Sequence, residues 1–173
     1  GTSFYACQVA TYWIEKYVNI SANAYLASEY RYKPYIKSSL ETLEIFISQS
    51  GETADTLAAL KFAKKNKSKT LSLVNVNESS ISRESDYSLS IAAGPEIGVA
   101  STKAFSAQLC VLGCLCLVMA RNKKKITKVE ELTLTESLLE LPSSILSVLD
   151  NGERIKLAVK NFVNAKSALF LGR

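Results

Sequence analysis

The sequence ISQSGETADTL at residues 47–57 decides the fold. It follows the apolar run at residues 43–47, which is rich in β-branched side chains and typical of a buried strand. It leads into Leu57, Leu60 and Ala63, which share one face at helical spacing. The sequence therefore predicts a strand, a tight glycine loop and a helix in direct succession.

Strand and helix patterns alternate over the rest of the chain. Helical spacing predicts helices over residues 5–18, 99–119, 128–149 and 152–163. Short apolar or alternating runs predict further strands at residues 24–27, 71–74, 86–91 and 167–171. Because strands that alternate with long helices form parallel βαβ units, we expect an α/β fold whose parallel sheet is covered on both faces.

The composition limits the possible functions. The chain has 173 residues, of which 47% are apolar and 21% charged, as in a globular protein of one domain or of one domain and part of a second. The net charge of +5 is spread out and too small to argue for nucleic acid. No histidine is present, which excludes a Ser-His-Asp triad, a Cys-His pair and a His-ligated metal within this chain.

Four cysteines, Cys7, Cys110, Cys114 and Cys116, are predicted to be buried, reduced thiols. The sequence has no CxxC pair, and Cys110 and Cys114 would stack on one helix face, a poor geometry for a disulfide. Such thiols are typical of a cytosolic protein, and we expect neither a metal site nor a cofactor.

The loop at residues 48–53 follows a strand and precedes a helix. Ser48, Gln49, Ser50 and Thr53 surround Gly51 there, and the first N–H groups of a helix attract anions. No lysine follows the glycine, so this is not a nucleotide-binding P-loop. Phosphate binding and simple helix capping by Ser50 and Thr53 both fit these residues.

Acidic residues near this loop bear on the choice between those two readings. Glu52 and Asp55 disfavour an anion at the helix start unless they point away from it. Asp55 and Glu52 would equally favour the first turn if the hydroxyls only cap the helix.

Two further loops carry hydroxyls and precede predicted helices. Thr2 and Ser3 either cap the first helix or contact a ligand, and two convergent hydroxyl loops suit a phosphorylated polyol better than a nucleotide. In the loop around residues 96–103, Ser101 or Thr102 either caps the long helix or contacts a ligand. The simpler alternative for this loop is capping together with a surface ion pair between Glu96 and Lys103.

Three other segments favour structural roles. The apolar run at residues 109–120 is about 12 residues long, whereas a membrane span needs about 20, so we expect a buried core or interface helix. The lysines at residues 61–69 fit a solvated helix end. The mixed aromatic and basic segment at residues 30–35 fits an interface better than RNA stacking.

Residues 47–57 together with EIGVASTKAF at residues 96–105 resemble the sugar-isomerase (SIS) domain family, and within it the first SIS domain of the glutamine–fructose-6-phosphate aminotransferases. Residues 27–32, residues 83–86 and the Gly1-Thr2-Ser3 opening match in the same order, so the resemblance covers essentially the whole chain. It implies a three-layer, doubly wound α/β sandwich with a mainly parallel sheet, followed by connecting helices. It also implies a cytoplasmic homodimer that binds fructose 6-phosphate, or glucosamine 6-phosphate as product, without contact to membrane or nucleic acid.

The resemblance assigns sugar-phosphate contacts residue by residue. They are the phosphate-holding Ser48, Ser50 and Thr53 with Gln49 beside them, Thr2 and Ser3 completing the contacts, and Val99 and Ser101 on the sugar side. It assigns no catalytic residue to this chain. The family's glutaminase domain, and the glutamate, lysine and histidine of isomerisation, have no match here, so we expect binding without turnover.

The two chain ends predict a fragment. We expect a first SIS domain lacking its first strand at residues 1–125, a helical connector at 126–163 and the start of a second SIS domain at 164–173. Two alternatives stay open. One is a non-catalytic sugar-phosphate-sensing SIS module of a regulator, and the other is an oligomerisation domain whose hydroxyl loops are only caps.

Overall fold

The computed structural model describes residues 1–34, 41–98 and 101–169. Its contacts divide the chain into two compact units, Gly1–Thr127 and Lys128–Arg173. Each unit is described below by itself.

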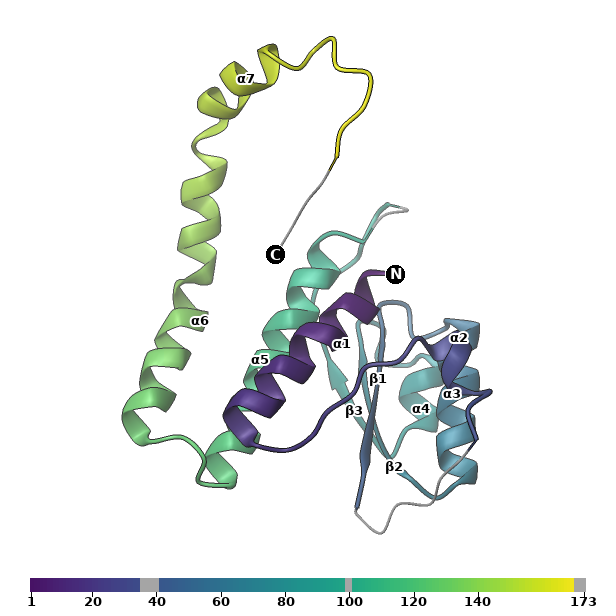
Figure 1. The fold of residues 1–173 in the computed structure, drawn as a ribbon. Helices are drawn as coiled ribbons and strands as arrows, with labels where there is room; N and C mark the ends of the chain where they lie inside the picture. Colours follow the sequence, from purple (N-terminus) through teal and green to yellow (C-terminus); the bar gives the residue numbers. More distant parts are fainter. Residues whose placement is uncertain (35–40, 99–100, 170–173) are drawn as a thin grey trace. The chain divides into compact units, whose positions relative to one another are not determined.

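The first unit contains a parallel sheet of three strands in the order β1-β2-β3 (Figure 1). The strands are β1 (Leu43–Ser48), β2 (Lys69–Val74) and β3 (Tyr87–Ser90). The strands predicted at residues 43–47, 71–74 and 86–91 are confirmed. Because all three run the same way, the loops that follow them meet at one edge of the sheet.

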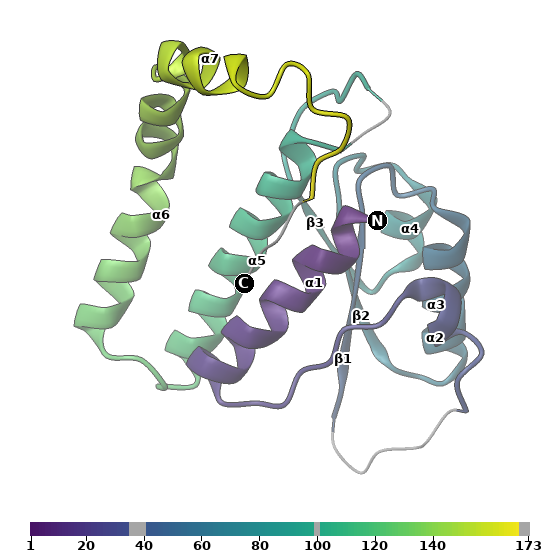
Figure 2. The same ribbon diagram turned by 45° about the horizontal axis from the view of Figure 1, so that its top comes forward.

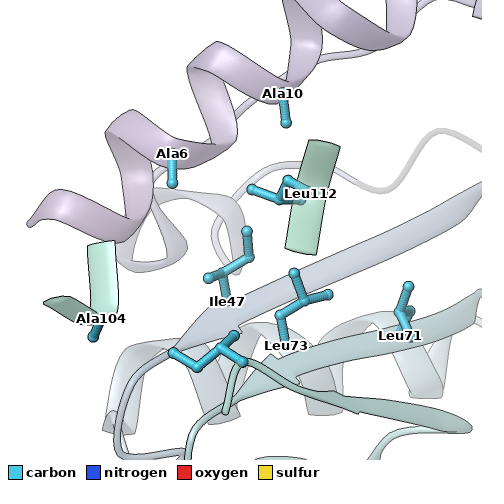
Figure 3. Packing of buried hydrophobic residues seen from close by; sticks show 8 residues of the cluster. Ala6, Ala10, Ile47, Leu71, Leu73, Ala104 and Leu112 are labelled. Carbon is cyan, nitrogen blue, oxygen red and sulfur yellow. The ribbon is translucent and has the colours of Figure 1, made fainter. Parts of the chain in front are cut away.

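Helices α1 (Thr2–Trp13) and α5 (Lys103–Asn122) cover one face of the sheet. Ala6 of α1 and Leu112 of α5 lie in one core cluster with Ile47 of β1 and Leu73 of β2 (Figure 3). Helix α1 continues as a π-helical segment, η1 (Ile14–Val18), so the helix predicted over residues 5–18 is confirmed. The helix predicted from residue 99 begins at Lys103.

Helices α3 (Ala54–Lys65) and α4 (Ser80–Glu84) cover the opposite face. Phe46 and Val74 alternate with the residues of the first face and pack against Leu60 and Ile81. The unit is therefore the expected three-layer α/β sandwich with a parallel sheet, and Figure 2 shows the helices on either side of the strands.

The prediction of a strand at residues 24–27 is wrong. Ala27 begins the short helix α2 (Ala27–Tyr30), and residues 24–26 have no regular structure. The apolar side chains of this run pack within the first unit, and the backbone pairs with no strand among the described residues. The Tyr25 ring lies 5.6 Å from the Tyr30 ring, and Ala27 packs against the cluster beneath α3.

The second unit consists of α6 (Lys128–Leu149) and α7 (Gly152–Lys160), which confirms the two predicted helices. The strand predicted at residues 167–171 is not present at residues 167–169, and residues 170–173 lie outside the described part. The division into SIS domain, connector and second SIS domain stays a prediction.

The four cysteines are free thiols. Cys116 is buried and Cys7 is half-buried, and burial raises the pKa of Cys7 to about 11. The prediction of burial is wrong for Cys110 and Cys114, which are exposed because they lie off the buried stripe of α5. The thiols therefore differ in their exposure to reagents.

Helices α5 and α6 are long and apolar enough to cross a membrane by length and composition alone. One third of the apolar stretch of α5 is buried inside the structure. The predicted core helix at residues 109–120 is thus buried along one stripe and exposed elsewhere.

Candidate functional site

The hydroxyl groups of the loop at residues 48–53 form a hydrogen-bonded turn around Gly51. Ser48 is buried at the end of β1, and its Oγ accepts a hydrogen bond from the Gly51 N–H at 3.0 Å. The same oxygen lies 2.9 Å from Thr53 Oγ1. Ser50 Oγ accepts from the Glu52 N–H at 3.2 Å. The four polar residues predicted for this loop, Gln49 among them, therefore lie at the carboxyl end of β1.

The start of α3 is not capped by these hydroxyls. Thr53 is the N-cap residue, but its side chain makes no capping hydrogen bond. Ser50 bonds to the N–H of Glu52, which precedes the helix. The prediction that Ser50 and Thr53 cap the helix is wrong, because the Thr53 hydroxyl pairs with Ser48 instead.

The nearby carboxylates point to other partners. Glu52 Oε1 accepts from the Ser80 N–H at 2.7 Å, at the start of α4, and this hydrogen bond lowers the pKa of Glu52 below its ordinary value. Asp55 pairs with the Arg31 guanidinium at 3.7 Å. Glu52 is thus directed to the start of α4. Asp55 lies in the first turn of α3, where the Arg31 guanidinium offsets its charge and reduces the repulsion that an anion would meet.

Gly51 fits where no other residue would. Its φ is +67°, and a Cβ at this position would lie 1.9 Å from Ser79 Oγ and 2.3 Å from Ser79 Cβ. Its carbonyl accepts from the Ile81 N–H at 3.0 Å. The segment after β2 therefore fixes the loop after β1. Sequence reasoning missed Ser79, although adjacent hydroxyls following the second strand of a parallel sheet were an available signal.

Asn75, directly after β2, is a second residue that sequence reasoning missed. Its N–H donates to the Gln49 carbonyl at 3.0 Å. Its side chain donates from Nδ2 to the Gly94 carbonyl at 2.7 Å and accepts at Oδ1 from the Ala93 N–H at 2.9 Å. One residue thus ties the loop after β1 to the loop after β3. A polar amide immediately after an apolar strand was the available signal.

Thr2 and Ser3 form the first turn of α1, with Gly1 as the N-cap. Figures 1 and 2 both place this end of α1 near the carboxyl end of β1, on the side of the sheet that α1 and α5 cover. Ser3 Oγ accepts a hydrogen bond from Gln108 Nε2 of α5 at 3.1 Å. The two hydroxyls predicted here therefore lie at the same edge as residues 48–53.

The start of α5 is held by a carboxylate. Glu96 Oε1 accepts from the Thr102 N–H at 2.8 Å, which lowers the pKa of Glu96 below its ordinary value. The expected capping by Ser101 or Thr102 is wrong, because Glu96 takes that place. Of the alternative ion pair, only the longer-range attraction is seen in the described residues: the charge of Lys103 helps to lower the pKa of Glu96, while Lys103 Nζ donates to the Pro95 carbonyl.

Ser101 Oγ is buried and has no hydrogen-bond partner among the described residues. Val99, the other residue assigned to the sugar side, lies outside the described residues. The loop therefore presents one unmet hydroxyl next to the start of α5.

Comparison with known proteins identifies the family of this chain. The chain belongs to the SIS domain family, whose sequence pattern matches residues 1–118. The resemblance seen in the motifs is thereby confirmed.

Three relatives aligned over the whole chain share one enzyme name, fructose-6-phosphate aminotransferase. The chain is 45% identical over 174 residues to the glutamine–fructose-6-phosphate aminotransferase (isomerizing) of Neisseria meningitidis and 41% identical to that of Bartonella quintana. Its fold matches the C-terminal domain of glucosamine-fructose-6-phosphate aminotransferase from Francisella tularensis with a TM-score of 0.92 and 40% identity.

These alignments cover all of this chain but only part of the relatives. The chain spans 28% of the two curated relatives and 49% of the Francisella chain. A glucosamine-6-phosphate deaminase from Thermotoga maritima, at 24% identity and a TM-score of 0.64, shares the fold.

Proposed function

We propose that this chain is the fructose-6-phosphate-binding part of the isomerase region of a glutamine–fructose-6-phosphate aminotransferase. One observation carries the proposal. A turn of hydroxyl groups around Gly51 opens onto an uncapped helix start while the adjacent carboxylates are engaged elsewhere. The names of the relatives aligned over the whole chain supply the substrate class.

In this proposal the phosphate is held without a cation. The Ser50 and Thr53 hydroxyls donate to phosphate oxygens, and the first N–H groups of α3 add donors and the positive end of the helix dipole. Ser48 is assigned to the phosphate with them, and its oxygen also accepts the Gly51 N–H and so shapes the turn. Gln49 lies beside the phosphate.

The sugar lies toward the starts of α1 and α5. Thr2 and Ser3 approach it from α1, and Val99 and Ser101 from the loop before α5. The unpartnered Ser101 hydroxyl supports this placement, because a buried polar group without a hydrogen bond costs about 1–3 kcal/mol and a bound sugar would satisfy it.

The proposal extends to the whole protein. Ammonia released from glutamine by a glutaminase domain elsewhere in the polypeptide would convert fructose 6-phosphate to glucosamine 6-phosphate, with catalytic groups outside this chain. A second SIS domain, a homodimer and a cytoplasmic location complete it. The alternative of hydroxyl loops that only cap helices is disfavoured, because neither Ser50 nor Thr53 caps α3.

The proposal is tested by titrating the full chain with fructose 6-phosphate and following backbone amide shifts by NMR. We expect the largest shifts at residues 48–53 and at the start of α3. Ser50→Ala should weaken binding about tenfold, since a hydrogen bond to a charged group contributes about 1.5–3 kcal/mol.

Ser68→Ala is the matched control, because Ser68 precedes β2 at the opposite edge of the sheet and should leave the affinity unchanged. Largest shifts away from residues 48–53, or equal affinities for the two variants, would contradict the proposal.

A further inference from the structure

The buried stripe of α5 contains one polar residue. Its members are spaced four residues apart and face the core: Ala104, Gln108, Leu112, Cys116 and Ala120. Figure 3 shows Ala104 and Leu112, the neighbours one turn before and after Gln108, packed near α1 and the sheet. Gln108 is fully buried. Burying an amide is unfavourable unless it is hydrogen-bonded, so packing alone does not account for a glutamine here.

A hydrogen bond from the Gln108 amide leads to the candidate site. Nε2 donates to Ser3 Oγ in the first turn of α1 at 3.1 Å. Oε1 is buried and has no partner among the described residues. The amide is therefore held only through the hydroxyl of a residue assigned to the sugar phosphate.

The direction of this hydrogen bond decides what Ser3 can do. A serine hydroxyl has one proton to donate and two lone pairs to accept. When Ser3 Oγ accepts from Gln108, its own proton remains free to be donated to another acceptor.

We propose that Gln108 is a positioning residue that holds the Ser3 hydroxyl as a donor toward the sugar phosphate. This inference rests on the proposed function and names a residue outside the set assigned by resemblance. Gln108 does not touch the ligand; it acts through Ser3. Gln108 is fully buried, which restricts the rotamers open to its side chain.

The test is a double-mutant cycle in the full chain, with fructose 6-phosphate binding measured by calorimetry. Ser3→Ala and Gln108→Met are made singly and together, since methionine keeps the length of the side chain and removes the amide. We expect Ser3→Ala to weaken binding about tenfold and Gln108→Met to weaken it about threefold to tenfold. In the Ser3→Ala background, Gln108→Met should have no further effect.

A merely structural role for Gln108 gives a different result. The Gln108→Met loss would then be the same with or without the Ser3 hydroxyl, and additive losses overturn the inference. Unchanged affinity in the Gln108→Met single variant also overturns it.

Two controls keep these outcomes distinct. If Gln108→Met fails to fold, as judged by thermal unfolding, Gln108→Glu is used in the same cycle, because a carboxylate of the same shape accepts the Ser3 proton and should weaken binding at least as much. Ser50→Ala reports on the proposed function independently. Loss of binding in Ser50→Ala with none in Gln108→Met defeats only the positioning role, and no loss in either defeats the proposed function.

Discussion

The starts of α3 and α5 contain similar residue types but differ in their hydrogen bonds. Each follows a parallel strand, and each has a threonine N-cap, Thr53 or Thr102, whose side chain makes no capping bond. Each is preceded by a glutamate. Glu52 turns away to the start of α4, whereas Glu96 accepts the N–H of Thr102 at the start of its own helix.

The difference shows how the same residue types leave one helix start open and close another. A carboxylate placed at a helix N-terminus already satisfies the donors and the positive dipole end that a phosphate would use. At the start of α5, Glu96 already accepts the Thr102 N–H, whereas Asp55 in the first turn of α3 pairs with the Arg31 guanidinium. We therefore expect phosphate at α3 and uncharged hydroxyls of the ligand at α5.

Among the substitutions that test this comparison, Gly51→Ala should change the free energy of unfolding most. Gly51 and Gly94 lie in the loops before α3 and α5 and share a φ of +67°, but a Cβ at Gly51 would collide with Ser79 while a Cβ at Gly94 meets nothing within 4 Å. We expect Gly51→Ala to lower the free energy of unfolding by about 2–5 kcal/mol through strain and overpacking together. Urea denaturation measures it.

Gly94→Ala is the matched control for this prediction. It carries the same backbone strain without the collision, so it should cost only about 1–2 kcal/mol. Equal losses in the two variants would show that Ser79 does not constrain the loop before α3.

Ser48→Ala should have the next largest effect. Ser48 and Ser90 both end strands, and each hydroxyl accepts an N–H from the loop that follows, at 3.0 Å from Gly51 and at 3.2 Å from Ala92. Ser48 is buried and Ser90 is exposed, so only Ser48→Ala leaves a buried N–H unpaired. We expect about 1–3 kcal/mol from Ser48→Ala and less than about 0.5 kcal/mol from Ser90→Ala in chemical denaturation.

A reversed order, with Ser90→Ala the more harmful, would mean that the loop before α5 depends on its strand-end hydroxyl more than the loop before α3 does. Equal effects would remove burial as the cause of the difference.

The smallest expected effect is the dependence of stability on pH through Glu52 and Glu96. Backbone hydrogen bonds from Ser80 and Thr102 lower the pKa of Glu52 and of Glu96 below 4.5. A carboxyl whose folded pKa is depressed stabilises the fold above its unfolded pKa, and this stability is lost as the pH falls through the folded value. We expect carbon-detected NMR titration to place both carboxyls below 4.5, and Glu52→Gln to reduce the loss of stability on acidification.

Asp86 supplies the reference for that titration. Hydrogen bonds from Lys64 Nζ and from Thr70 lower its pKa from 3.8 to about 2. It should therefore be the last of the three to protonate. A titration in which Glu52 or Glu96 protonates at or above 4.5 would contradict the contacts that distinguish the two helix starts.

The fold was largely predictable because its signals are local. The β-branched run at residues 43–47 and the helical spacing after Leu57 identify a strand and a helix without knowledge of any contact. Residues 24–27 misled because a short apolar run fits a strand or a buried anchor equally well. What decided it was the packing of Ala27 against a core cluster that includes Phe46 and Leu60, which are distant in sequence.

The candidate site was predictable in its residue types and not in its hydrogen bonds. Hydroxyls after a strand were sufficient to locate the loop at residues 48–53. Whether Glu52 faces an anion or the start of α4 depends on the position of Ser80, which is set by tertiary structure. The roles of Ser79 and Gln108 were missed for the same reason, since each acts on a residue contributed by another element.

Asn75 couples the loop after β1 mechanically to the loop after β3. Its backbone N–H donates to the loop after β1, and both ends of its side-chain amide bond to the loop after β3. A displacement of one loop should therefore displace the other. A ligand that binds against Gln49 would therefore restrict the motion of the residues around Gly94 without contacting them. Cooperativity between the two halves of a bound molecule would then be transmitted through Asn75, at the carboxyl end of the central strand β2.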